Sequence, residues 1–306
     1  MDTLSELLEA HPARGNLDIR CQWSGPWAAP HPAEAPGAVR LHVVVRGHVY
    51  LRVPGESPIA LTAGDLAVLP SGDAHILAGR PDDWHAPPPV AAVRAHPLLE
   101  WQTNGEAEPE LDMLCGRIDF GAGAATLLAA LPRVLCLRGS DGEQLAPVVE
   151  LLRSEVQAAA PGARSVVGQL SSALFVLALR HWWNGRGELH GVLGLLREPR
   201  LRAACTAMLL HQHEPLTIDT LADSCHMSRA SFLRLFERVT RTTPAHMLTQ
   251  LRMDTAAVRL HRGRETVGAI AEAVGFQSES AFIRAFERHK GMSPATYRRG
   301  VRAEVA

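Results

Sequence analysis

Two cysteines and three histidines in the first 120 residues are the side chains best suited to chemistry in this 306-residue chain. Cys21 lies in LDIRC and Cys115 in MLCGR, segments that can form neighbouring strands. Oxidation of such a thiol pair would change local packing and switch a distant activity. The alternative is that both are small, buried, apolar residues. Cys136, Cys205 and Cys225 are interpreted as packing residues, and the absence of a CxxC pair argues against a zinc ribbon or finger.

The histidines His31, His42 and His75 are candidate metal ligands. His31 is expected in a Pro-rich loop and His42 on a strand, and His75 ends the segment GDLAVLPSGDAH. Three imidazoles at one barrel mouth suit zinc, copper or nickel. The alternative is that they are core histidines whose nitrogens bond to the backbone.

The segments around these residues predict a β domain followed by helices. LHVVVRGHVYLRV (41–53) predicts two strands split at Arg46-Gly47, 60–77 predicts two more, and 113–120 another. The Pro-rich stretch 80–110 predicts a long loop. Residues 143–183 show two helical apolar patterns separated by Pro161-Gly162. These two helices either form a dimer face or pack on the β domain.

An internal repeat dominates the last hundred residues. SRASFLRLFERVTRTTP (228–244) aligns with SESAFIRAFERHKGMSP (278–294) at an offset of 50 without a gap. The preceding LADSCHMS (221–228) and IAEAVGFQS (270–278) match with one extra residue in the second turn. Each copy predicts a helix, a short turn and a second helix capped by a serine. Two helix-turn-helix units are therefore expected.

The second helix of each unit keeps a polar or basic face outward, because its phenylalanines lie at i and i+4 and face inward. Such a face fits the major groove of DNA, where an arginine can contact a guanine edge or a phosphate. The predicted DNA-binding residues are Ser228, Arg229, Ala230, Leu233 and Arg234 in the first unit, and Gln277, Ser278, Glu279, Ser280, Ile283 and Arg284 in the second.

Charge and connector length agree with DNA as the partner. Residues 200–306 contain 16 basic and 10 acidic residues, whereas the whole chain has a net charge of −1. The segment 244–262 predicts a helix of roughly 25 Å, which can place two recognition helices in successive major grooves.

At these residues the chain resembles the AraC/XylS family. Residues 269–299 are similar to its signature in the IA pair, the GF before the second recognition helix, the F-x-x-x-F spacing and G-x-S-P-x-x-Y-R. The resemblance implies a seven-helix DNA-binding domain with two helix-turn-helix units joined by a long helix. The first unit departs from it only in RTTP (241–244), where a Gly commonly precedes the Pro.

The N-terminal zone resembles the cupin-like sensor domain of some members of this family. Gly64, Pro70, Gly72 and His75 fit the second cupin motif, G-x5-P-x-G-x2-H, while the first motif is degraded. The start MDTLSELL, the placement of Cys21 and the histidines, and LCG around Cys115 are similar to a reactive-chlorine-sensing branch, which implies an oxidant-responsive activator.

Together these observations predict an α+β chain: a cupin-like antiparallel β-barrel (1–140), a helical pair (141–198) and an all-α DNA-binding domain (199–302). The expected partners are double-stranded promoter DNA, RNA polymerase and a second copy of the chain. No apolar run long enough to cross a membrane and no secretory signal are found, which predicts a cytoplasmic protein. The alternatives are a barrel that binds a small organic effector or a metal, and a metal-dependent cupin enzyme, which the missing His-x-His…Glu ligands disfavour.

Overall fold

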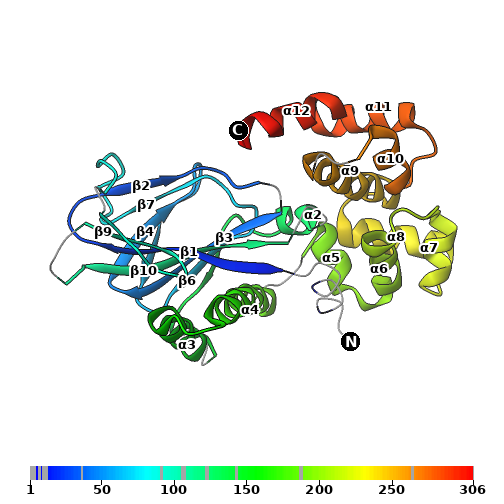
Figure 1. Ribbon diagram of the computed structural model, residues 1–306. Coiled ribbons are helices and arrows are strands. Elements are labelled where there is room, and N and C mark those ends of the chain that lie inside the picture. Colours follow the sequence, from blue (N-terminus) through cyan, green and yellow to red (C-terminus); the bar gives the residue numbers. More distant parts are fainter. Residues whose placement is uncertain are drawn as a thin grey trace. The chain divides into compact units, whose positions relative to one another are not determined.

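The computed structural model describes residues 5, 8, 13–35, 37–89, 92–104, 108–120, 124–141, 144–185, 189–262 and 265–305. The chain divides into two compact units, which Figure 1 shows in one view. The barrel unit comprises Ala13–Phe120 and Pro132–Arg186, and the helical unit comprises Met1–Pro12, Gly121–Leu131 and Gly187–Ala306. No helix of the described ranges is both long and apolar enough to span a membrane.

Two facing sheets build the barrel unit. The seven-stranded sheet has the order β11-β6-β3-β10-β1-β9-β8 and the four-stranded sheet the order β2-β7-β4-β5. The strands are β1 (Arg14–Trp23), β2 (Ala28–His31), β3 (Ala38–Arg46), β4 (His48–Arg52), β5 (Ile59–Thr62), β6 (Leu66–Leu69), β7 (His75–Ala78), β8 (Ala92–Arg94), β9 (Glu100–Thr103), β10 (Leu111–Asp119) and β11 (Leu135–Leu137). Neighbouring strands are antiparallel except for β1 and β9, which are parallel.

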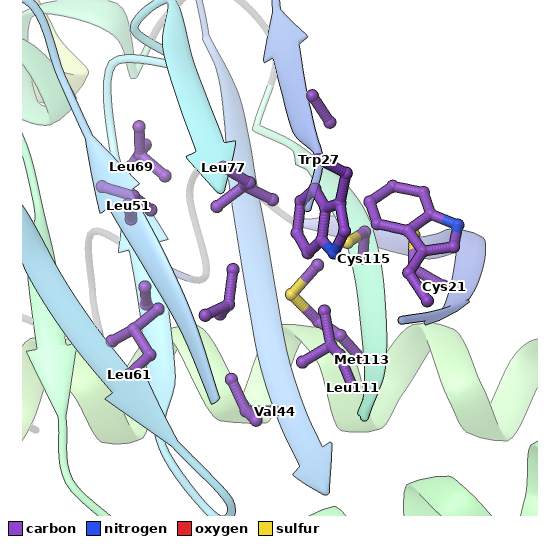
Figure 2. Close-up of a cluster of buried hydrophobic side chains, with 14 of the residues drawn as sticks. Cys21, Trp27, Val44, Leu51, Leu61, Leu69, Leu77, Leu111, Met113 and Cys115 are labelled. Carbon is purple, nitrogen blue, oxygen red and sulfur yellow. The ribbon is translucent and has the colours of Figure 1, made fainter. Parts of the chain in front are cut away.

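Apolar side chains from both sheets fill the interior between them. Figure 2 shows part of this core, in which Leu51, Leu61 and Leu77 are almost fully buried. Gly47 forms the tight turn between β3 and β4 at a φ of 83°, and a Cβ there would overlap the carbonyl oxygen of Glu110. Only glycine fits this turn, which carries the chain from β3 in one sheet to β4 in the other and divides the two strands at Arg46-Gly47 as the sequence predicts.

Three sequence-based expectations for the barrel are wrong in detail. Residues 80–110 are not one long loop, because they contain β8 and β9, and β9 pairs with β1 far away in the sequence. Residues 60–77 contribute to three strands instead of two. His31 ends strand β2, where Pro30 is tolerated because β2 lies at the edge of its sheet. Pairing between distant segments leaves no local pattern that would predict it.

The two helices after the barrel are α3 (Leu145–Ala158) and α4 (Ala163–Asn184), as the apolar pattern predicts. Both belong to the barrel unit, and α4 packs along β1 of the seven-stranded sheet (Figure 1). The predicted separate segment 141–198 is therefore divided. Its helical pair covers the barrel, while α5 (Gly191–Arg197) belongs to the helical unit.

The helical unit is built from short helices around one long connector. From Arg202 onward its described residues form α6 (Arg202–Leu210), α7 (Ile218–Ser224), α8 (Arg229–Thr240), α9 (Pro244–Arg262), α10 (Val267–Ala273), α11 (Glu279–Lys290) and α12 (Pro294–Val305). They are preceded by α2 (Ala125–Ala129), α5 and a 3₁₀ turn, Pro199–Leu201. The seven-helix arrangement implied by the family resemblance is confirmed.

Candidate DNA-binding helices and a buried thiol–imidazole row

The two helix-turn-helix units repeat each other in backbone detail. In the first turn the amide of Met227 donates to the carbonyl of Ala222 at 3.0 Å, and in the second the amide of Phe276 donates to Ala271 at 2.9 Å. Each bond joins residues five positions apart. Its donor comes directly after a residue in the left-handed conformation, His226 in one unit and Gly275 in the other. This is the Schellman way of ending a helix. The sequence repeat is therefore a structural repeat.

Serine caps begin both second helices. The Ser228 side chain accepts a hydrogen bond from the amide of Ser231, and Ser278 accepts one from Ala281. Each cap satisfies an amide that the first turn of the helix leaves without an intrahelical partner. The caps fix where α8 and α11 begin, and therefore which side chains lie in the first two turns.

The apolar faces of α8 and α11 hold these helices in place. Phe232, Phe236, Phe282 and Phe286 are fully buried, which confirms the inward i, i+4 pattern. In the second unit the phenylalanines pack on residues of α9 and α10 in a core that includes Leu260. With one face buried in this way, the opposite face of each helix is turned to solvent.

The predicted DNA-binding residues lie on that outer face. In the first unit Ser228, Arg229, Ala230 and Arg234 are exposed and Leu233 is half-buried; in the second Gln277, Ser278, Glu279, Ser280 and Arg284 are exposed and Ile283 is half-buried. Arg229 is paired with Asp219 of α7 at 2.8 Å. No DNA is present, so base contact by these residues stays a prediction.

In the barrel, the two thiols chosen from the sequence meet. Cys21 on β1 lies opposite Met113 of β10, one diagonal position from Cys115, so both side chains enter the same core (Figure 2). Both residues are buried and belong to the same core cluster. The neighbouring Cys115 thiol and burial raise the pKa of the Cys21 thiol well above its usual value. The expectation of neighbouring strands is confirmed.

The three candidate histidines also converge inside the barrel, from opposite sheets. His42 comes from β3, and its Nε2 lies 2.9 Å from the Nε2 of His75 on β7. His31 on β2 is the cross-strand partner of His75, and their rings stack at 4.7 Å. The other ring nitrogen of His42, Nδ1, lies 3.1 Å from the Sγ of Cys115. The thiols and the imidazoles therefore form one connected row.

The backbone sets the direction of the hydrogen bonds in this row. His75 Nδ1 lies 2.8 Å from the carbonyl oxygen of Asp73, which only accepts, so this nitrogen carries the proton. In a neutral His75 the Nε2 then accepts a proton from His42 Nε2, which leaves His42 Nδ1 as the acceptor for the Cys115 thiol. The assigned chain runs from Cys115 through His42 and His75 to the carbonyl of Asp73.

Burial keeps these imidazoles neutral. It lowers the pKa of His31 to about 3, with His75 and Arg40 adding to the effect. It also lowers the pKa of His42 well below its usual value, and that of His75, for which the hydrogen bond to Asp73 acts in the opposite direction. A neutral imidazole can accept a proton from a thiol.

The same histidines were candidate metal ligands. Among the described residues, no three His, Cys, Asp or Glu side chains are arranged as a metal-holding group. His42 and His75 instead use their nitrogens on each other and on Cys115 and Asp73, while the buried Nε2 of His31 has no hydrogen-bond partner. Metal binding by these histidines stays a prediction.

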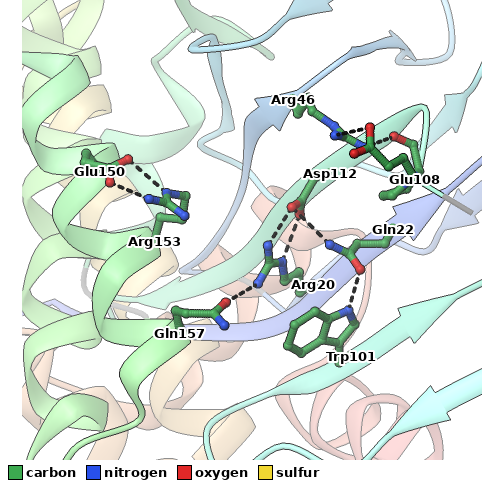
Figure 3. Close-up of polar contacts among 10 residues, drawn as sticks. Arg20, Gln22, Arg46, Trp101, Glu108, Asp112, Glu150, Arg153 and Gln157 are labelled. Atoms are coloured by element: carbon green, nitrogen blue, oxygen red, sulfur yellow. Dashed lines mark hydrogen bonds and ion pairs between the residues drawn. The ribbon is translucent and has the colours of Figure 1, made fainter.

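Sequence reasoning missed a buried ion pair on the other face of β1. Figure 3 shows Arg20 in two hydrogen bonds to Asp112 of β10, at 2.9 and 2.6 Å, while its guanidinium lies 4.4 Å from the ring centre of Trp101. Gln157 of α3 accepts a further bond from Arg20 at 3.4 Å. The network joins the two strands that carry Cys21 and Cys115 to the covering helix. Its only sequence signal is charge within strand-like segments.

Comparisons with known proteins agree with both units. Residues 2–184 match the family described as Cupin, and residues 221–300 match the one described as Helix-turn-helix domain. With the paired, capped helices described above, these matches define a DNA-binding transcriptional regulator. The described part of the N-terminal motif MDTLSELL is limited to Ser5 and Leu8, so the rest of that motif lies outside the described residues.

The relatives extend this class to a particular family. An "Uncharacterized HTH-type transcriptional regulator" of Haemophilus influenzae is 32% identical over 98% of this chain and 99% of its own length. The "RCS-specific HTH-type transcriptional activator RclR" of Escherichia coli is 32% identical over 99% of both chains. The solved DNA-binding domain of AdpA in complex with a target DNA is 34% identical over 35% of this chain and 96% of its own, with a TM-score of 0.33. The chain belongs to the AraC family of transcriptional regulators with an N-terminal cupin domain.

Proposed function

We propose that this regulator is a transcriptional activator that senses an oxidant through Cys21 and Cys115. The observation that carries the proposal is the position of the two buried thiols in one core, on adjacent strands and one diagonal step apart, with His42 in contact with Cys115. The relative RclR is described as RCS-specific and as an activator. In this proposal the protein acts in the cytoplasm, on double-stranded promoter DNA and together with RNA polymerase.

The imidazole row gives Cys115 the role of the attacking thiol. Neutral His42 accepts the proton of Cys115 at Nδ1 and passes its own Nε2 proton to His75. The proton moves as the sulfur attacks, because burial disfavours a lasting imidazolium in this row. Cys21 keeps its proton until the second step, because its pKa is raised.

With hypochlorous acid as the oxidant, the reaction is a two-electron oxidation. The Cys115 sulfur attacks chlorine, and hydroxide leaves and takes the relayed proton as water. The Cys21 sulfur then attacks the sulfenyl chloride at Cys115, chloride leaves, and the Cys21 proton is released. Two thiols and one hypochlorous acid thus give one disulfide, water, chloride and a proton.

A mechanical link from the thiols to the rest of the barrel unit supports the proposal. Arg20 neighbours Cys21 in β1, and Asp112 lies three residues before Cys115 in β10. The Arg20–Asp112 pair bonds to Gln157 on α3, so a shift of β1 against β10 changes the contact with that helix (Figure 3). The helical pair is the element through which we propose that oxidation reaches the DNA-binding unit.

In the DNA-binding unit, α8 and α11 insert into successive major grooves. The arguments are the matched exposure of Arg234 and Arg284 and the 19-residue connector α9. A homodimer is also part of the proposal. Leu151 on α3 and Val166 on α4 are exposed apolar residues, at 46% and 38% exposure, and are the proposed contacts. Sedimentation of the reduced and the oxidised protein measures this association.

The decisive experiment combines peptide mapping with transcription. The full chain is treated with one equivalent of hypochlorous acid, and free thiols are blocked before mass spectrometry. We expect a Cys21–Cys115 disulfide and activation of a promoter in vitro, and we expect Cys21→Ser to lose both. Cys225→Ser is the control. Cys225 lies in the helical unit, so this variant keeps both barrel thiols.

A fully responsive Cys21→Ser protein contradicts oxidant sensing by this pair. If that variant still responds to a small organic compound or to a metal ion, the barrel is an effector pocket instead. Turnover of a substrate by the metal-loaded protein would favour the cupin-enzyme alternative.

A further inference from the structure

A basic cavity lies within the helical unit, beside the C-terminal end of the first recognition helix. It has a volume of about 390 Å³ and is lined by residues of 189–198, which include α5, and of 238–241, at the end of α8. Three arginines line it: Arg197, Arg238 and Arg241. Leu189 and Val239 give it an apolar part.

The carboxylate of this cavity offsets its positive charge only in part. Glu198 is the acidic lining residue, and both its oxygens are bonded to Arg200, at 2.8 and 3.0 Å. Within the described ranges, no carboxylate forms an ion pair with Arg238 or Arg241. Two guanidinium groups are therefore available to an added anion.

Arg241 occupies a backbone position that costs energy. It ends α8 at a φ of 61°, whereas the equivalent residue fifty positions later, Gly291, ends α11 at a φ of 73°. A left-handed conformation costs a residue with a side chain about 1–2 kcal/mol, and glycine pays no such penalty. The first unit thus keeps a strained arginine where the second has the unstrained residue, which points to a role for the side chain.

The chemistry of the cavity selects the ligand class. Paired guanidinium groups bind carboxylates through parallel, charge-assisted hydrogen bonds. A volume near 390 Å³ lies at the lower end of the range for small-molecule sites, and the apolar part can cover a hydrocarbon or aromatic body. A compact carboxylate with an apolar body satisfies both features.

We propose that this cavity is a binding site for a small organic carboxylate, held by Arg238 and Arg241. The site belongs to the helical unit, whereas the thiols belong to the barrel unit. It lies at the contact between α5 and the end of α8, where His190 Nδ1 is 3.4 Å from the carbonyl oxygen of Val239. A Cβ on Gly194 would lie 2.7 Å from the same oxygen, so α5 packs tightly there. A bound carboxylate would therefore adjust the position of the first recognition helix.

Calorimetric titration of the full-length, reduced protein with benzoate tests the proposal. Benzamide, which has nearly the same shape without the charge, is the matched probe. We expect saturable benzoate binding with a Kd below about 1 mM, and at least tenfold weaker binding of benzamide, since loss of a charge-assisted pair costs about one tenfold step or more.

Three variants locate the site. Arg241→Gly copies the second unit, removes the backbone strain and is expected to fold at least as well as the parent protein. Arg238→Gln removes the other guanidinium. Each should weaken benzoate binding at least tenfold. Arg288→Gln, at the position equivalent to Arg238 in α11, should bind benzoate as the parent protein does.

Equal binding of benzoate and benzamide, or unchanged benzoate binding by Arg241→Gly and Arg238→Gln, would overturn the proposal. A third outcome also overturns it: no benzoate binding, with weaker DNA binding by both variants, would make these arginines phosphate contacts to DNA. None of these results depends on the oxidant response of the barrel.

Discussion

Arg252 and Gly275 pack so closely that the second helix-turn-helix unit has no room for a side chain at its turn. A Cβ on Gly275 would lie 2.7 Å from the Nη2 of Arg252 and 2.9 Å from the carbonyl oxygen of Gln212. Arg252 in turn donates from Nε to that oxygen at 2.8 Å and from Nη2 to the carbonyl of Glu214 at 2.9 Å. The connector helix α9 therefore fixes both the loop before α7 and the turn before α11.

Gly275→Ala is expected to destabilise the helical unit by more than 2 kcal/mol, roughly the sum of left-handed strain and steric overlap. Gly291→Ala is the matched control. Gly291 also has a positive φ, but nothing lies within 4 Å of its added Cβ, so only the strain of about 1–2 kcal/mol remains. Denaturant unfolding followed by circular dichroism measures both. Equal losses would contradict the packing role of Arg252.

The helical unit could be predicted almost completely from the sequence, because its determinants are local. The caps Ser228 and Ser278, the buried phenylalanines and the repeat at an offset of 50 lie within a few residues of the features they specify. The outer faces of α8 and α11 follow from the same periodicity. His226 and Arg241 are the exceptions, since their left-handed conformations are not indicated by their residue types.

The barrel site could be predicted only as a set of candidates. The sequence indicates that Cys21, Cys115 and the histidines are able to carry chemistry. It also predicts that the two thiols lie on neighbouring strands. It does not indicate that His42 of one sheet meets His75 of the other, or that His42 bonds to Cys115, because both contacts depend on strand pairing and sheet packing over long sequence distances. The Arg20–Asp112 pair, 92 residues apart, was missed for the same reason.

Arg234→Ala and Arg284→Ala should each weaken specific DNA binding by about 1–3 kcal/mol if the arginines contact bases. Both side chains are exposed at equivalent positions of α8 and α11. Footprinting and titration on the target promoter and on unrelated DNA separate base contacts, which reduce discrimination, from phosphate contacts, which weaken all sequences alike.

Arg180→Ala, an exposed arginine of α4 in the barrel unit, is the control for these two variants. Binding of the parent protein should also weaken steeply as salt rises, because phosphate contacts release counterions. Unchanged footprints for both recognition-helix variants, or a flat salt dependence, would be incompatible with this assignment.

Asp112→Ala is expected to destabilise the barrel unit by about 3–5 kcal/mol, because it leaves the buried charge of Arg20 without a partner. The two side chains are only 8% and 10% exposed. Tryptophan fluorescence reports on this unit selectively, since Trp23, Trp27, Trp84, Trp101, Trp182 and Trp183 are all six tryptophans of the chain and all lie in it.

The control for the ion pair is Glu150→Ala, which breaks the exposed Glu150–Arg153 pair on α3 (Figure 3). Solvent screens that pair, so no measurable loss is expected. A double variant, Arg20→Met with Asp112→Leu, should recover much of the lost stability, because apolar groups of similar size replace both charges. A small effect of Asp112→Ala would mean that water reaches Arg20.

Acid should destabilise the barrel unit before most carboxylates titrate. His31 stays neutral in the folded state down to a pKa of about 3, whereas in the unfolded chain it takes up a proton below about pH 6.5. The unfolded state then binds more protons, so the free energy of unfolding falls as pH falls from 6.5 towards 3, by at most about 1.4 kcal/mol per pH unit for each such histidine. His42 and His75 act in the same direction, since burial lowers their pKa values too. Above pH 6.5 all three are neutral in both states and contribute no slope.

Urea unfolding between pH 7.5 and 4.5, followed by tryptophan fluorescence, should show this decline, and His31→Gln should reduce its slope. His48→Gln, which changes an exposed histidine of β4, should leave the slope as it is. If His31→Gln also leaves the slope unchanged, His31 is protonated in the folded barrel, and the neutral imidazole row on which the thiol chemistry depends is not formed as described.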